Sequence, residues 1–315
     1  MENKEVGLND YRSIRKDQFF KWMQFIKERF HPGSHFLMIF LFLVGHYFVA
    51  YASQHVTVSG IDILFIMMGT AVFFLKLRFY DEIKDYELDL EIKPYRPLPR
   101  GLLTPFDVKK GIENCIVLEI IFFSACGKPG LLMILVSIGY SLLMYNEFFI
   151  PKLIRPHLTT YATTHTVVTL FLSLTIFSAL GGQWVWNMDP DFYYFALMNW
   201  ILFNIFELGR KTFQPEEEKN AIESYSKVWT RPGAFLLVLA QAILASYLLL
   251  QVSTLYFFDI QNYLIGTLIL LVIIGLVYIF IPKKSTGHIY RAFSSLFIII
   301  FYSIIIGNYI VRQFF

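Results

Sequence analysis

Residues 78–101 have the sequence RFYDEIKDYELDLEIKPYRPLPRG and directly follow a long apolar segment. Three aspartates in this stretch are spaced four residues apart: Asp81, Asp85 and Asp89. If the apolar segment is a helix that continues to this point, their carboxylates form a ladder on one face, with Glu82 on its flank. Magnesium suits such a ladder, because it takes one or two carboxylates and shares its other ligands with water and phosphate oxygens. The alternative is a solvated charged face that Lys84 and Lys93 balance.

The ladder belongs to a chain with long apolar segments on both sides of it. A helix needs about 20 apolar residues to cross a bilayer. The sequence has nine such segments, at 35–53, 59–79, 107–126, 129–149, 159–180, 192–208, 234–251, 261–281 and 289–311. Hydrophobic residues make up 56% of the 315 residues, above the roughly 45–50% of soluble domains. The sequence therefore predicts one domain over residues 1–315, an all-α, polytopic membrane protein with nine transmembrane helices.

Basic residues in the connections predict the orientation of these helices. They occur in the N-terminal segment and after the second, fourth, sixth and eighth apolar segments, whereas the other connections together hold one, Lys128. Because basic loops stay in the cytoplasm, we expect the N-terminus inside and the C-terminus outside, in the inner membrane if the source is bacterial. Residues 10–30 mix basic and aromatic side chains, which indicates a helix at the membrane interface or a solvated cytoplasmic helix. The net charge of +3 is too small to indicate a nucleic-acid partner.

Acidic residues gather in two windows, 80–110 and 207–231, which hold 12 of the 24 in the chain. Each window follows the second span of a four-span group and contains an Arg-Pro pair before the next helix. This similarity indicates an internal duplication, with two pseudo-repeated four-helix groups and a ninth helix around a central cavity. Both windows are cytoplasmic in the predicted topology, and we expect acidic loops there at 80–106 and 209–233.

The second window begins at the end of the sixth apolar segment with Asn204 and Glu207, three residues apart on one helix face. Arg210 and Lys211 follow directly and could hold phosphate oxygens. The acidic run Glu216–Glu218 allows two interpretations. It is a second metal cluster, or it is a helix N-terminus after a proline, where acids suit the helix dipole.

Ionisable side chains also lie inside or at the ends of the apolar segments. Glu119 lies within the third segment, Glu147 ends the fourth, and His165 opens the fifth. Such a group at membrane depth is a functional candidate. Each could contact a substrate, or could be satisfied by a hydrogen bond inside the bundle. Tyr225, in the second window, is a further candidate for substrate binding.

The two acidic motifs resemble those of the UbiA superfamily of intramembrane prenyltransferases. That family has nine transmembrane helices and aspartate-rich motifs on the cytoplasmic loops after helices two and six. Its first motif is Asn-Asp-x-x-Asp-x-x-x-Asp, followed by Arg-Pro-(Leu/Ile)-Pro-x-Gly. The matching residues of this chain are Asp81-Glu82-x-x-Asp85-x-x-x-Asp89 and then Arg96-Pro97-Leu98-Pro99-Arg100-Gly101. The chain departs from the family where Asn-Asp becomes Asp-Glu, and where the second motif, usually Asp-x-x-x-Asp, keeps one acid, Glu207.

The resemblance implies a magnesium-dependent transferase. Two Mg²⁺ ions, bridged by the two acidic loops, would bind the diphosphate of an isoprenyl donor. The implied ligands are Asp81, Glu82, Asp85, Asp89, Glu207, Glu216 and Glu217, of which the first five are also expected to be catalytic. The implied cationic contacts to the diphosphate are Lys84, Arg96, Arg210 and Lys211. Loss of diphosphate leaves an allylic cation, which a small aromatic or lipid-like acceptor captures within the membrane lipid.

Two other functions fit parts of the pattern. A terpene cyclase of the same fold would ionise the same donor but let the donor's own double bonds capture the cation. A membrane transporter could use the acids to bind cations, although transporter sites usually lie near the midplane of the membrane on broken helices.

Overall fold

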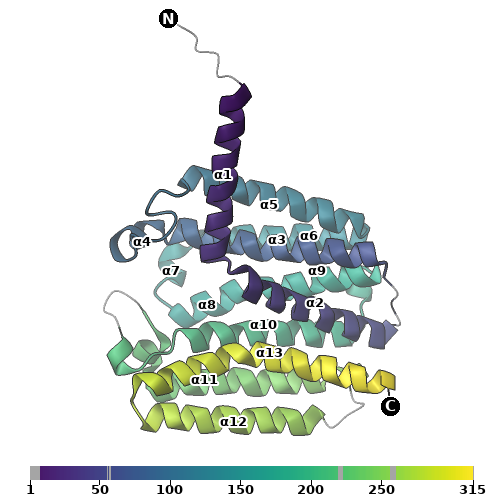
Figure 1. Ribbon diagram of the computed structural model, residues 1–315. Helices are drawn as coiled ribbons and strands as arrows, with labels where there is room; N and C mark the ends of the chain where they lie inside the picture. Colours follow the sequence, from purple (N-terminus) through teal and green to yellow (C-terminus); the bar gives the residue numbers. More distant parts are fainter. Residues whose placement is uncertain (1–7, 55, 57, 219–222, 256–259, 315) are drawn as a thin grey trace, which may run out of the picture. The chain divides into compact units, whose positions relative to one another are not determined.

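The structure, a computed structural model, describes residues 8–54, 56, 58–218, 223–255 and 260–314. These residues form helices and connecting turns without any strand (Figure 1). The long helices are α1 (Leu8–Arg29), α2 (Pro32–Gln54), α3 (Gly60–Lys84), α5 (Pro105–Ala125), α6 (Lys128–Tyr145), α9 (Val168–Gly181), α10 (Pro190–Arg210), α11 (Tyr225–Leu250), α12 (Ile260–Phe280) and α13 (Lys284–Phe314). The short helices are α4 (Tyr86–Ile92), η1 (Glu147–Phe149), α7 (Pro151–Ile154), α8 (Leu158–Thr166), η2 (Val185–Asn187), η3 (Pro215–Glu217) and η4 (Ser253–Leu255). The all-α prediction is therefore confirmed for the described residues.

Each predicted membrane segment overlaps a helix, and seven helical segments of the described chain are long and apolar enough to cross a membrane. α8 and α9 together make one of the seven. The two predicted spans outside this group are α5 and α10, in which charged and polar residues lower the apolar character. The multi-pass prediction is thus confirmed, and the number of nine spans stays a prediction.

The helices group into two compact units. The first unit consists of Met1–Met38 and Ala71–Glu119, and the second unit of Ile39–Thr70 and Ile120–Phe315. α2, α3 and α5 each contribute residues to both. The predicted single domain, internal duplication and central cavity stay predictions.

In the first unit, α1 packs on α3 through aromatic rings. Phe25 is fully buried, and its ring centroid lies 5.6 Å from that of Phe79. The ring of Trp22 lies 5.5 Å from that of Phe79. Phe19 and Phe20, on the same helix, are 61% and 65% exposed. The predicted N-terminal helix is therefore present, and its place at the membrane interface stays a prediction.

In the second unit, α10 lies at the centre of the packing. It contacts α8, α9, α11 and α13, while α12 contacts α11 and α13 (Figure 1). Asn199, in the middle of α10, is buried and donates to the hydroxyl of Ser173 at 3.1 Å. It accepts a hydrogen bond from Tyr302 and lies 3.4 Å from the ring of His46. A helix enclosed by other helices can carry polar residues because those helices satisfy them in place of water.

Candidate functional site

The first acidic segment, residues 81–89, covers the end of α3 and most of α4. The continuous helix that the ladder assumes is interrupted once, because a turn at Asp85 separates α3 from α4. Asp85 keeps φ −87° and ψ −1°, so the chain stays close to the right-handed helical region. Its amide donates to the carbonyl of Asp81 at 2.9 Å, and the amide of Asp89 donates to the carbonyl of Asp85 at 2.8 Å. The predicted four-residue spacing along one helical path therefore survives the turn.

The four carboxylates of this segment differ in exposure. Asp81 and Asp85 are exposed, whereas Glu82 and Asp89 are each 2% exposed. Glu82 and Asp89 are seven residues apart, two helical turns, so they share a face. The predicted ladder thus has an exposed edge and a buried edge, and Glu82 belongs to the buried one.

Asp89 is held by two basic side chains that follow it in the sequence. Arg96 donates to one carboxylate oxygen, and the Lys93 ammonium lies 3.7 Å from the other. α4 ends before Pro94, and a further proline at 97 keeps the chain in turns. Those turns bring Arg96 back onto α4. Arg96, which the resemblance assigns to the diphosphate, is therefore paired with an acid of the same segment.

Glu82 is held by two arginines. Arg29, the last residue of α1, donates to Oε1 at 2.5 Å, and Arg78 donates to the same oxygen at 2.9 Å. The other carboxylate oxygen, Oε2, is buried and has no hydrogen-bond partner among the described residues. Sequence analysis missed Arg29, and no local pattern could have identified it, because it lies 53 residues from Glu82.

The first acidic segment fits a magnesium site only in part. Among the described residues, no three His, Cys, Asp or Glu side chains lie close enough together to hold a metal ion. Magnesium bound with a diphosphate needs only one or two carboxylates, because phosphate oxygens and water complete its shell. The exposed pair Asp81 and Asp85 could supply these, and the unpartnered oxygen of Glu82 is a further donor atom. Lys84, at the end of α3, is half-buried beside them in the sequence.

The second acidic segment, residues 204–218, begins at the end of α10. Glu207 pairs with Arg210 at 2.5 Å and with Lys211 at 2.9 Å, and its side chain is 15% exposed. The two basic residues predicted to grip a diphosphate are therefore bonded to the predicted metal ligand. Asn204, one turn earlier, accepts from the hydroxyl of Thr166 and donates to Gln241 at 3.3 Å. It takes part in helix packing and not in the charge pairs of Glu207.

The run after Pro215 begins with a short helix, as one of the two interpretations of these acids expects. Pro215–Glu217 forms a short helix, and Glu217 caps it by accepting from the amide of Gln214 at 3.1 Å. Glu217 also accepts two hydrogen bonds from Arg291, at 2.8 and 2.6 Å, and its side chain is 8% exposed. These bonds to Arg291 lower the pKa of Glu217 below its usual range. The structure thus shows the helix N-terminus, and a metal role for Glu217 stays a prediction.

The contact between Glu217 and α13 requires a glycine. A Cβ added to Gly287 would lie 2.6 Å from the Glu217 carboxylate and 2.9 Å from the side chain of Gln214. Glu218 has other partners, since it accepts from Ser224 and Ser226 at 2.7 Å. Glu216 is exposed. Residues 219–222 of the predicted second loop lie outside the described residues.

The remaining residues predicted to bind substrate, Tyr225, Glu147 and His165, lie in the second unit. Tyr225 begins α11, is fully buried, and its hydroxyl has no hydrogen-bond partner in the described part of the chain. Glu147 accepts from Arg155 at 2.7 Å. His165 bonds through Nδ1 to the carbonyl of Tyr161 at 2.6 Å and stacks on its ring at 3.9 Å. The substrate-binding roles of the three candidates stay predictions.

The turn that carries Glu147 is unusual. Glu147, Phe148 and Phe149 have φ values of 52°, 54° and 58°, in the left-handed region that costs free energy for residues other than glycine. The ring of Phe148 packs edge-on against His165 at 6.0 Å. The turn therefore joins two of the predicted candidates through one aromatic contact.

Glu119 has a partner that sequence analysis missed. Lys76 of α3 donates to its carboxylate at 2.6 Å, and both side chains are fully buried. The Lys76 ammonium also lies 4.2 Å from the centre of the Phe73 ring. One Glu119 oxygen is therefore stabilised by a buried ammonium, whereas the other, Oε1, is buried without a hydrogen-bond partner among the described residues, and contact with a substrate stays a prediction.

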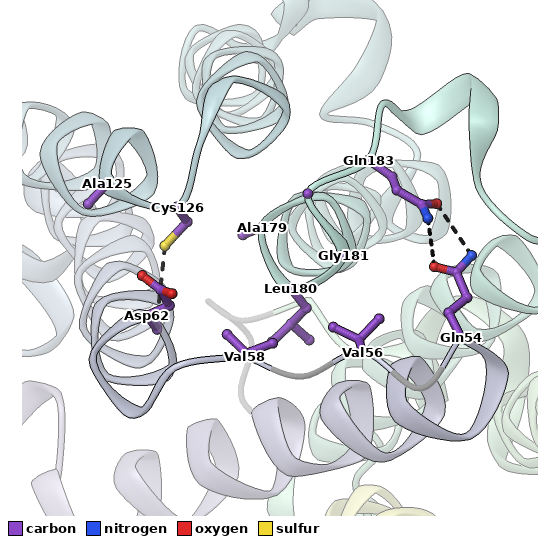
Figure 2. Close-up of a pocket in the computed structure, with 11 residues that line it drawn as sticks. Gln54, Val56, Val58, Asp62, Ala125, Cys126, Ala179, Leu180, Gly181 and Gln183 are labelled. Atoms are coloured by element: carbon purple, nitrogen blue, oxygen red, sulfur yellow. Dashed lines mark hydrogen bonds between the residues drawn. The ribbon is translucent and has the colours of Figure 1, made fainter.

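A cavity of about 440 Å³ in the second unit holds none of the predicted site residues (Figure 2). It is lined by Gln54, Val56, Val58, Asp62, Ala125, Cys126, Ala179, Leu180, Gly181, Gly182 and Gln183. Two hydrogen bonds, at 2.9 and 3.3 Å, join the side-chain amides of Gln54 and Gln183 on one side of it (Figure 2). The cavity lies where α9 ends, and Glu207 lies where the next long helix, α10, ends. It is therefore at the opposite end of the second unit from Glu207.

The long apolar helices define the chain as a multi-pass α-helical membrane protein. The sequence predicts that its two acidic segments face the cytoplasm. The fold of the chain is similar to that of two solved structures, one of them a UbiA homolog. A structure of digeranylgeranylglyceryl phosphate synthase superposes with a TM-score of 0.63 at 15% identity, over 92% of this chain and 99% of that one. The apo structure of a UbiA homolog from Aeropyrum pernix K1 superposes with a TM-score of 0.61 at 14% identity, over 87% of this chain and 98% of that one.

The sequence comparisons add no relative. No family model matches the chain, and no curated protein matches it. At 14–15% identity, the likeness to the two solved structures concerns the fold. The predicted resemblance to the UbiA superfamily is confirmed at that level.

Proposed function

We propose that this protein is a magnesium-dependent transferase that moves an isoprenyl group from an isoprenyl diphosphate to a small aromatic or lipid-like acceptor within the membrane. The observation that carries the proposal is the first acidic segment. It places four carboxylates at the end of a membrane-length helix in a UbiA-type fold, and one of their oxygens, Oε2 of Glu82, is buried without a partner. A buried carboxylate oxygen without a partner is costly, and a cation would relieve that cost.

The residues of the first acidic segment have different roles in this proposal. Asp81 and Asp85 are exposed and would meet the metal directly, while Asp89 is held by Arg96 and fixes the turn. Arg96 and Lys84 would contact the diphosphate, and Arg96 would have to exchange its bond to Asp89 for a phosphate oxygen. A guanidinium suits that exchange because it binds carboxylate and phosphate in the same geometry.

The second acidic segment contributes Glu207, Arg210 and Lys211 to the same proposal. A carboxylate and two cations lie together at one helix end, where the Glu207 side chain is 15% exposed and the two basic side chains are 46% and 35% exposed. An anionic substrate could draw the cations away and leave the carboxylate to a metal. We expect replacement of any of the three to change turnover.

The chemistry requires heterolysis of the bond between the isoprenyl carbon and the diphosphate oxygen. The electron pair leaves with the diphosphate, an acceptor atom forms the new bond to the allylic cation, and a proton leaves the acceptor. Magnesium, when bound, supplies positive charge that stabilises the departing diphosphate. The chain's own arginines and lysines would add further positive charge beside the departing diphosphate.

The direct test is incubation of the purified protein with geranyl, farnesyl or geranylgeranyl diphosphate, with and without Mg²⁺ and a lipid extract. Products are identified by mass spectrometry, and released diphosphate is measured in parallel. We expect diphosphate release and a prenylated product only with both Mg²⁺ and extract. An isoprenoid hydrocarbon or alcohol formed from donor alone would identify a cyclase. No release with any donor, in protein shown to be folded, would refute the transferase and leave transport as the function to test.

A further inference from the structure

The last two residues of α1, Glu28 and Arg29, contact the first acidic segment and the tail 96–101 that follows it. All of these residues belong to the first unit. The two contacts join parts of the chain that are 53 and 72 residues apart. α1 therefore touches the site of the proposed reaction, although it lies outside both acidic segments.

The contact that Arg29 makes is buried. Arg29 donates to Oε1 of Glu82 at 2.5 Å, and the two side chains are 14% and 1% exposed. Burying a carboxylate is costly unless a charged partner accompanies it. Arg78, on the same helix as Glu82, is a second partner at 2.9 Å from the same oxygen. Glu82 is thus held from two helices, and Arg29 is the partner that comes from outside α3.

Arg78 extends this contact to the exposed end of α3. Its Nη2 atom donates to Glu82, and its Nη1 atom lies 3.4 Å from the carboxylate of Asp81. Arg78 is therefore a bridge between a buried carboxylate and an exposed one. Because Arg29 gives Glu82 a second cation, Arg78 can serve both carboxylates.

The packing of α1 on α3 fixes the end of α1 from which Arg29 projects. The ring centroids of Trp22 and Phe25 lie 5.5 and 5.6 Å from that of Phe79. Gly111 of α5 allows this close packing, because an added Cβ would lie 2.8 Å from Trp22 and 3.0 Å from Phe79. A side chain on a helix that is packed in this way is a rigid support for the groups it contacts.

The neighbouring contact of Glu28 is more exposed. Its carboxylate accepts two hydrogen bonds from Arg100, both of 2.8 Å. The side chains of Arg100 and Glu28 are 33% and 34% exposed, and exposed ion pairs contribute little to stability. Glu28 is therefore a matched control, because its replacement breaks an ion pair at the same helix end and leaves the two arginines of Glu82 in place.

We propose that Arg29 is a positioning residue for the reaction proposed above. It holds the buried carboxylate of Glu82, and through the Arg78 bridge it keeps Asp81 where this segment would meet a metal. No bond forms or breaks at Arg29 in the reaction, and its part is to orient groups that support the metal site. The N-terminal helix thereby belongs to the site, a role that rests on the proposed function.

The experiment compares six forms of the full chain: wild type, Arg29→Lys, Arg29→Gln, Glu82→Gln, the double variant of Arg29→Gln with Glu82→Gln, and the control Glu28→Gln. With the isoprenyl diphosphate that wild type turns over, diphosphate release gives kcat, the KM of the donor and the Mg²⁺ concentration for half-maximal rate. Hydrogen exchange is measured by mass spectrometry, without substrate, in peptides that contain Asp85 and Asp89, whose amides are hydrogen-bonded in this segment. It reports the order of the segment independently of turnover.

We expect Arg29→Gln to lower kcat about 10- to 100-fold, the range for groups that support a metal site, and to raise the Mg²⁺ requirement. The KM of the donor at saturating Mg²⁺ should stay near wild type, and hydrogen exchange in the segment should become faster. Arg29→Lys should recover part of the rate, because an ammonium keeps one charged donor at Glu82. Glu28→Gln should match wild type within about twofold in all of these quantities.

The double variant tests whether Arg29 acts through Glu82. It should be no slower than Glu82→Gln alone, because the carboxylate that Arg29 holds is already gone. It also removes the buried carboxylate together with its arginine. The double variant and Arg29→Lys therefore still decide the question where Arg29→Gln alone fails to fold.

Three results would overturn the proposal. A raised donor KM in Arg29→Gln, with kcat and the Mg²⁺ requirement unchanged, would make Arg29 a contact of the donor. Losses that multiply in the double variant would show that Arg29 acts independently of Glu82. An Arg29→Gln variant that matches wild type in both rate and exchange would show that the ion pair positions nothing. The absence of diphosphate release by wild type would instead refute the proposed function, and the positioning role with it.

Discussion

The two acidic segments contain the same residue types but bond them differently. In the first, Glu82 and Asp89 are buried, and Glu82 receives Arg29 from another helix. In the second, Glu207 is paired within one helical turn with Arg210 and Lys211. Glu217 caps a short helix and forms an ion pair with Arg291 of α13.

The difference shows that a cluster of acids is not by itself a binding site. An acid whose oxygens are all bonded to protein groups stabilises the fold, whereas an acid with an unpartnered oxygen can accept a ligand. Two acids meet this criterion among the described residues, Glu82 and Glu119. Glu82 alone of the two belongs to an acidic segment, so we place the centre of the proposed chemistry in the first segment. Glu207 is intermediate, since its partners are partly exposed and could be exchanged.

The largest expected effect concerns whether the two segments share one side of the membrane. Reporter fusions at Gln183 and at the C-terminus should report outside, and a fusion at Glu217 inside, because the loop charges follow the positive-inside rule. Alkaline phosphatase and a fluorescent protein serve as opposite reporters. A cytoplasmic C-terminus would contradict nine spans, and a Glu217 fusion that reports outside would separate the two segments across the bilayer.

The next largest effect is expected at Asp85. Asp85→Asn should lower turnover roughly 100-fold or more, because it removes a carboxylate next to a leaving group that carries negative charge. Glu87→Gln is the matched control, an exposed acid on the adjacent turn that belongs to no predicted site. Turnover is measured by product mass spectrometry and folding by size-exclusion chromatography. Equal activity in the two variants would show that the aspartate ladder is a solvated charged face and not a metal site.

A smaller effect is expected at Glu207. Glu207→Gln should lower turnover about 10- to 100-fold, the range for groups that support a metal site, and raise the Mg²⁺ concentration needed for half-maximal rate. Glu216→Gln, at an exposed position of the same segment, should leave both quantities near wild type. The assignment fails if Glu207→Gln is silent while Glu216→Gln abolishes activity.

The smallest effect on turnover is expected at Glu217. Glu217→Gln should lower the free energy of unfolding by about 1–3 kcal/mol, because Arg291 loses a charged partner, and should leave turnover per folded protein unchanged. Thermal denaturation in detergent measures the first quantity. A variant that folds normally but has lost activity would instead favour the metal-ligand interpretation.

The stability of wild type and of Glu217→Gln can also be compared as the pH is lowered. The pKa of Glu217 is lowered, by Arg291 first and also by the Gln214 amide and His288. A carboxylate with a lowered pKa stabilises the protein above its unfolded pKa of about 4.3, and this contribution disappears as the pH falls through the folded pKa. The stability difference between wild type and Glu217→Gln should therefore be constant near neutral pH and shrink below about pH 4.

Much of the fold could be predicted from sequence because its determinants are local. The length of an apolar run decides whether a helix can cross a bilayer, and all nine predicted runs overlap helices. The four-residue spacing of Asp81, Asp85 and Asp89 survives the turn at Asp85 for the same reason, since helical hydrogen bonds join residues four apart. The Arg-Pro tail also acts locally, by returning Arg96 to Asp89.

The tertiary structure alone decided which acids have a spare oxygen. Arg29 reaches Glu82 across 53 residues, Lys76 reaches Glu119 across 43, and Arg291 reaches Glu217 across 74. No periodicity connects such pairs, because they depend on how helices distant in sequence pack together. Burying a charge is tolerated only when packing delivers a partner to it, so the sequence could name the acids, and only the packed chain could show which of them are already satisfied.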